Sequence, residues 1–133
     1  MPHQNDWESR GVIQTFWGEV SAQEFVASVG EIAADPRFDD VRYIINDFSQ
    51  VTGLDTNDGT WESIAIIRIG SAHTNPNVRV LVVSQGAIGD KLVTAMARPP
   101  LIGTQQTVNF SSLEAARKWL EGQPALGIPR GRR

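Results

Sequence analysis

Residues 78–83 form a nearly continuous apolar run, broken only by Arg79, and this run constrains the fold more than any other segment. A strand with one face in water alternates apolar and polar residues, whereas a strand covered on both faces is apolar almost throughout. The run therefore predicts a central strand with other elements packed on both of its faces. Sheets of this kind are typical of the α/β class.

Strand and helix patterns alternate on either side of this run. β-branched and aromatic residues predict strands over residues 11–17, 41–45 and 104–110. Helical spacing of apolar residues predicts helices that follow each strand, over about 21–35, 58–72, 86–98 and 111–122. Residues 64–69 also fit a buried strand, but the length of the segment favours a helix. The order predicts one α/β sandwich: a four- to five-stranded, mostly parallel sheet with about four helices.

Residues that are typical of helix starts and ends occur at several points in the sequence. Ser21 with Glu24 and Ser111 with Glu114 have capping-box spacing, which predicts that each serine caps the helix that follows it. Pro36 ends the first helix, since proline disfavours helical geometry in the residue before it.

The chain of 133 residues is long enough for one domain, which we expect to span 7–122. Residues before Trp7 have no strong pattern and are expected to be loose, and residues 123–133 are expected to form a flexible basic tail. The chain contains no cysteine, so it has no disulfide framework and a cytoplasmic location is expected. No apolar stretch approaches the roughly 20 residues that insertion into a membrane requires.

Charge is divided unevenly along the chain, although the net charge is only −3. Residues 1–62 carry 12 of the 15 acidic residues, whereas residues 63–133 carry 9 of the 12 basic ones. The two halves can neutralise each other within one domain, or they can form a bipolar surface that orients partners or pairs two copies as a homodimer. The basic tail is too short to indicate nucleic-acid binding.

Residues 47–59 resemble the signature of anti-sigma factor antagonists (STAS, SpoIIAA-like), in which a strand ending in D-x-S-x-V-T leads to D-S-S-G at a helix N-terminus. Five residues fall in register: Asp47, Ser49, Val51, Thr52 and Asp55. The whole chain is also similar to small bacterial SpoIIAA-like proteins, related in fold to CRAL-TRIO lipid-binding domains. This second pattern rests on Asp35-Pro36-Arg37-Phe38, Phe110, Leu113, Glu114-Ala115-Ala116 and Trp119-Leu120.

The resemblance implies a SpoIIAA-like fold and a protein-docking loop. The candidate loop residues are Asp47, Ser49, Asp55, Thr56, Asn57 and Asp58.

One departure bears on regulation, because Asn57 stands where the antagonists carry their phosphorylated serine. Thr56 keeps a hydroxyl, but a phosphate there would be repelled by Asp55 and Asp58. The plainer interpretation is that Asp55, Thr56 and Asn57 cap the following helix.

The sequence contains no recognisable catalytic motif. It has two histidines, His3 and His73, and no cysteine, so the common histidine and thiolate metal sites are not expected. A magnesium site built from Asp47, Asp55 and Asp58 remains an alternative. We therefore expect no enzyme activity and no cofactor.

The sequence favours a non-enzymatic regulatory domain that binds a protein partner. The alternative is a carrier for a lipid or another small apolar ligand, and an unrecognised enzyme is a third possibility. A carrier would need a cavity between helices and sheet, lined by residues such as Trp61, Ile64, Ile67 and Met96.

Overall fold

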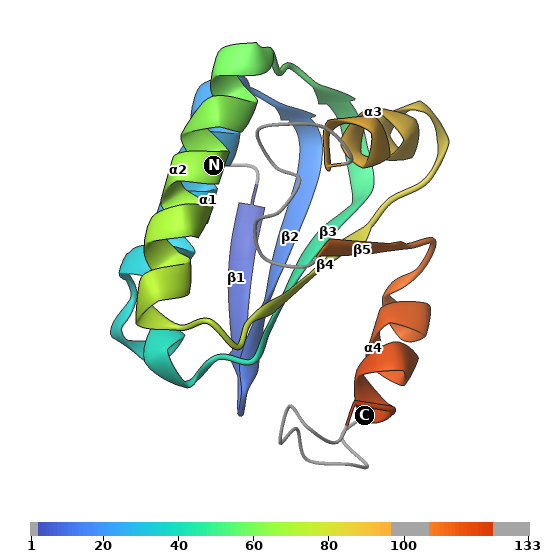
Figure 1. Cartoon of the computed structure of the whole chain (residues 1–133). Helices are drawn as coiled ribbons and strands as arrows, with labels where there is room; N and C mark the ends of the chain where they lie inside the picture. Colours follow the sequence, from blue (N-terminus) through green and yellow to red (C-terminus); the bar gives the residue numbers. More distant parts are fainter. Residues whose placement is uncertain (1–2, 97–106, 124–133) are drawn as a thin grey trace.

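The computed structural model describes residues 3–96 and 107–123, which form one five-stranded sheet flanked by helices (Figure 1). The sheet follows chain order, with β1 antiparallel to β2 and β2 to β5 mutually parallel. The strands are β1 (His3–Glu8), β2 (Gly11–Val20), β3 (Tyr43–Leu54), β4 (Arg79–Val83) and β5 (Thr107–Phe110). The helices are α1 (Ala22–Ala34), the 3-10 helix η1 (Pro36–Asp40), α2 (Asp58–Thr74), α3 (Gly86–Met96) and α4 (Leu113–Glu121). The predicted α/β sandwich with a mostly parallel sheet is confirmed.

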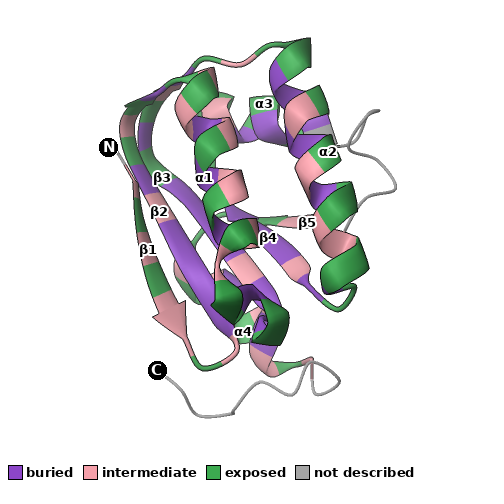
Figure 2. Ribbon diagram, turned by 90° about the vertical axis from the view of Figure 1, so that its left-hand side faces the viewer, coloured by how far each residue is buried: buried purple, intermediate pink, exposed green. Residues whose placement is uncertain are grey.

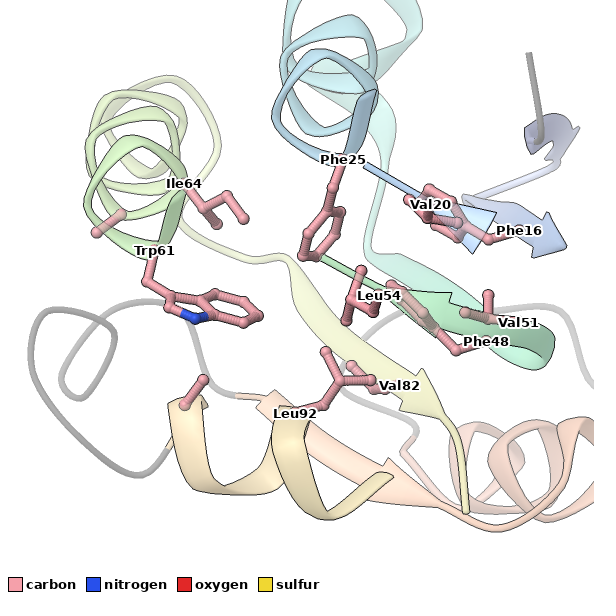
Figure 3. Close-up of a cluster of buried hydrophobic side chains, with 12 residues drawn as sticks. Phe16, Val20, Phe25, Phe48, Val51, Leu54, Trp61, Ile64, Val82 and Leu92 are labelled. Carbon is pink, nitrogen blue, oxygen red and sulfur yellow. The ribbon is translucent and has the colours of Figure 1, made fainter. Parts of the chain in front are cut away.

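Three helices share one face of the sheet. The side chains of β2, β3 and β4 on that face pack with α1, α2 and α3 into the largest apolar cluster (Figure 3). Its aromatic rings interlock: Phe16 stacks on Phe48 at 4.7 Å, and Phe25 meets the Trp61 ring edge-on at 5.7 Å. The cluster consists of Phe16, Val20, Phe25, Phe48, Val51, Leu54, Trp61, Ile64, Ala65, Val82, Leu92 and Ala95.

The opposite face of the sheet is covered by α4, whose buried Ala116 and Leu120 pack on strand residues such as Ile45 and Leu81. The sheet centre is therefore buried on both sides, as the apolar run of β4 predicts (Figure 2). No helix in the described part of the chain is long and apolar enough to cross a membrane.

The N-terminal segment is not loose, so this expectation is wrong for His3 to Asp6. These residues belong to β1, which pairs along its whole length with β2. The strand is polar in composition, so its sequence lacks the usual β signal, and the ladder with β2 orders it instead. Glu31 on α1 adds hydrogen bonds to His3 and Asn5.

β3 is longer than the sequence predicts. The predicted strand ended near residue 45 and was followed by a loop, but β3 continues to Leu54. The reason is that β2 also continues, and it pairs with β3 as far as Val20 and Leu54. β4 stops earlier, opposite Asp47, so the last part of β3 has a partner strand on one side.

The predicted helix boundaries mostly hold. Ser21 Oγ accepts a hydrogen bond from the Glu24 N–H at 3.1 Å, and α1 ends before Pro36. The ambiguous segment around residues 64–69 is helical, within α2. The second cap is shifted by one residue, since Ser112 rather than Ser111 caps α4. Residues 104–106 of the predicted last strand and the tail beyond Gln123 lie outside the described residues.

Candidate functional site

Two of the candidate residues, Asp47 and Ser49, lie within β3 and not in a loop. Asp47 is buried, and its Oδ1 accepts a hydrogen bond from the Ser49 N–H at 2.9 Å. The bond spans the irregular stretch where the register between β2 and β3 shifts. Asp47 therefore stabilises β3 at this irregularity, within a strand that was predicted over residues 41–45 and in fact runs on to Leu54.

Asn57 caps α2. Its Oδ1 accepts from the Thr60 N–H at 3.0 Å, and Thr60 Oγ1 accepts from the Asn57 N–H at 3.1 Å, which completes a capping box. The interpretation of this loop as a helix cap is thus confirmed for Asn57. Asp55 instead uses its backbone, whose N–H donates to the Val20 carbonyl, and its side chain is exposed.

Thr56 lies between these two residues. Its Oγ1 is buried and has no hydrogen-bond partner among the described residues.

A groove of about 360 Å³ runs between the N-terminus of α2 and the side of α3. It brings Thr56, Asn57 and Asp58 together, whereas Asp47, Ser49 and Asp55 are not among the described residues that line it. The described lining is Thr56, Asn57, Asp58, Trp61, Asp90, Lys91, Thr94 and Ala95.

Half of this lining comes from α3, which carries none of the candidate residues predicted from the sequence. Lys91 Nζ donates to the Leu54 carbonyl at 2.5 Å, so it ties α3 to the end of β3. One signal could have found these residues, because α3 follows β4, the neighbour of β3 in a parallel sheet. Loops and helix starts that follow adjacent parallel strands meet at the same sheet edge.

The chemistry of the groove suits binding. Its lining includes the carboxylates of Asp58 and Asp90, the ammonium of Lys91, the exposed Thr94 and the largely buried Trp61. The described lining contains no histidine, which is the commonest general base. No group of three His, Cys, Asp or Glu side chains in the described part of the chain could hold a metal ion, so the magnesium alternative finds no site there.

One cavity between helices and sheet bears on the carrier alternative. Among the described residues, a cavity of about 30 Å³ remains between α1, α2 and the sheet, and Ile67 lines it. That volume suits about one water molecule. Trp61 and Ile64, which were expected to line a ligand cavity, pack in the core cluster (Figure 3), and the Met96 side chain lies outside the described residues.

No family model and no curated protein matches the chain. Several solved structures match it. The anti-sigma factor antagonist SpoIIAA in its unphosphorylated form matches with a TM-score of 0.56 and 14% identity, over 90% of this chain and 98% of that one. The Bacillus cell fate determinant SpoIIAA in the phosphorylated form gives 0.55 and 12%, over 89% and 98%.

An uncharacterized protein of the DUF3478 family from Shewanella loihica PV-4, described as having a SpoIIAA-like fold, gives a TM-score of 0.51 and 13% identity, over 89% of this chain and 91% of that one. At such identities the likeness is one of fold. The chain has a SpoIIAA-like fold, as the motif in residues 47–59 implied.

Proposed function

We propose that this chain, with its SpoIIAA-like fold, is a non-enzymatic regulatory domain that docks a partner protein in the groove between α2 and α3. The observation that carries the proposal is the position of the groove: the loop that resembles the antagonist signature forms one wall of it. The anti-sigma factor antagonist SpoIIAA has the same fold.

The groove suits a protruding side chain of another protein better than a free metabolite. It is open, and its polar groups come from α3 and from the start of α2 with the two residues before it, and they carry both signs of charge. Trp61 is part of the lining, and its ring is held in place by an edge-on contact with Phe25. Aromatic residues fixed in this way are common at the centres of protein interfaces.

Control by phosphorylation of the loop is not part of this proposal. Asn57 has no hydroxyl, and both its backbone N–H and its side-chain oxygen are engaged in the capping box. We infer that docking depends on the shape and charge of the groove.

The carrier alternative has less support. A lipid needs a pocket of several hundred Å³ with mostly apolar walls. The described residues between α1, α2 and the sheet leave about 30 Å³.

Site-specific photo-crosslinking in cells that express the chain tests the docking proposal. A photoreactive amino acid replaces Thr94 in the groove or, as the matched control, Ala27, which is an exposed position on α1. We expect a discrete protein adduct from position 94 and none from position 27. Mass spectrometry then identifies the partner for binding assays with purified proteins.

Two substitutions then test the site with that partner. Thr94→Arg places bulk in the groove and should weaken binding at least about tenfold, whereas Ala27→Arg should leave affinity unchanged. Melting temperatures of both variants control for folding. Equal adducts from the two positions, or full affinity of Thr94→Arg, would exclude docking in the groove.

A further inference from the structure

The outer side of α2 exposes two neighbouring isoleucines that the fold does not use. Ile66 is 70% exposed and Ile69 is 53% exposed. The inner side of the same helix already supplies the core with Trp61, Ile64 and Ala65. The other large apolar residues exposed in the described chain, Trp17 and Val93, belong to different elements. The pair on α2 is therefore an apolar patch without a partner in the described part of the chain.

The patch belongs to a regular stripe. Glu62, Ile66, Ile69 and His73 are all exposed and are separated by four, three and four residues. This is the spacing of the seam along which two helices of a coiled coil meet. In Figure 2, exposed stretches recur along α2, where it lies beside α1 on the sheet.

We propose that a second copy of the chain covers this stripe, with the two α2 helices packed antiparallel across a two-fold axis. In a two-fold interface, residue i of one copy contacts residue j of the other, and j contacts i in return. Antiparallel alignment places Ile66 against Ile69 of the second copy. The same alignment places Glu62 against His73 of the second copy at both ends of the seam.

The chemistry of the stripe is complementary only in this orientation. The imidazole of His73 has an N–H that can donate to the Glu62 carboxylate whether or not the ring is protonated. A parallel arrangement would instead place the two Glu62 carboxylates together, which is unfavourable. Antiparallel helices also align their dipoles in opposite directions.

Gly70, next to the stripe, allows a helix of the second copy to pack closely against α2. A Cβ atom at this position would have no atom within 4 Å, so the helix surface there is open. A helix of the second copy can approach the backbone of α2 at this point. None of the four stripe residues belongs to the described lining of the groove, so the pairing of two copies does not rest on the proposed function.

Sedimentation equilibrium over a range from micromolar to millimolar tests the pairing. We expect a concentration-dependent dimer whose dissociation constant rises at least about tenfold in Ile66→Lys. Val93→Lys is the matched control, since it also removes an exposed apolar residue from a helix but lies on α3. Circular dichroism confirms that both variants fold. A wild-type monomer at millimolar concentration, or equal effects of the two substitutions, would overturn the proposal.

Disulfide trapping tests the orientation, because the chain has no cysteine of its own. Glu62→Cys and His73→Cys are prepared separately and oxidised, alone and mixed. We expect efficient crosslinking only in the mixture, because disulfides need Cα atoms within about 7 Å. Two copies of position 62 would lie ~16 Å apart along the antiparallel helices. Crosslinking of Glu62→Cys with itself would indicate a parallel pair and overturn the proposed geometry.

Discussion

Asn57 stabilises the start of α2 through its side chain. Its Oδ1 is the acceptor for the Thr60 N–H, and the exposed side chain of Asp55 caps nothing among the described residues. We predict that Asn57→Ala lowers the free energy of unfolding by about 1 kcal/mol, because a helix N–H loses its acceptor. Asp55→Asn should change it by less than about 0.5 kcal/mol. Urea unfolding measures both values.

Asn57→Ser controls for this prediction, since serine is an equally good cap. It should keep nearly all of the stability that Asn57→Ala loses. If Asp55→Asn costs as much as Asn57→Ala, the cap has been assigned to the wrong residue.

The buried hydroxyl of Tyr43 makes the stability of the protein depend on pH in the alkaline range. Burial raises the pKa of Tyr43 well above its ordinary value of 10.0, and the hydrogen bond that its hydroxyl donates to Glu8 raises it further. A group whose pKa is raised on folding stabilises the protein below its unfolded pKa and loses that contribution as the pH rises beyond it. We predict that the free energy of unfolding falls as the pH rises above about 10.

Urea unfolding between pH 8 and pH 11 checks this slope, and Tyr43→Phe should flatten it. Tyr43 is the only tyrosine in the chain, so tyrosinate absorbance reports its ionisation directly. Absorbance that titrates near pH 10 in the folded protein would contradict the raised pKa.

β2 and β3 can pair at Gly11 because this residue has no side chain. The register places Gly11 opposite Tyr43, and a Cβ at position 11 would lie 2.3 Å from the tyrosine ring. We predict that Gly11→Ala costs about 1–3 kcal/mol, because the ring must move in a packed layer. Differential scanning calorimetry measures the change.

Gly70→Ala is the matched control for this prediction. Position 70 lies within α2 and faces open space, so alanine there should stabilise the helix by up to about 1 kcal/mol. Measurements at low protein concentration keep self-association out of the comparison. Equal effects of the two substitutions would show that the contact with Tyr43 is easily relieved.

β1 and the end of β3 show the limit of reading elements from sequence. The segment that forms β1 is polar, and the end of β3 carries the exposed Ser49 and Gln50, so neither has the alternation expected of a strand. Each is ordered by pairing with β2. β1 pairs with the strand that follows it directly, whereas the end of β3 pairs with residues more than 30 positions earlier in the chain. In both cases the order comes from the partner strand, which the residues of the segment itself do not indicate.

In the described structure, one ion pair joins the acidic first half of the sequence to the basic second half. Arg117 on α4 contacts Glu8 on β1 at 2.5 Å, whereas the Arg37–Asp35 ion pair and the contact of His3 with Glu31 lie within residues 1–62. Short-range pairing among the described residues therefore accounts for little of the charge imbalance. Much of the charge remains on the surface, where it can orient a partner.

Local sequence patterns predict the order of β2 to β5 and of α1 to α4, the α/β class and most helix ends, including the cap at Ser21. These features depend on residue periodicity and on contacts between residues a few positions apart. The tertiary structure decided the length of β3, the presence of β1, and which candidate residues meet. Thr56 and Lys91 face one groove because β3 and β4 are neighbours in the sheet, while Asp47 is held within its strand. Neighbours across a sheet are set by the packing of the whole chain, which no local pattern records.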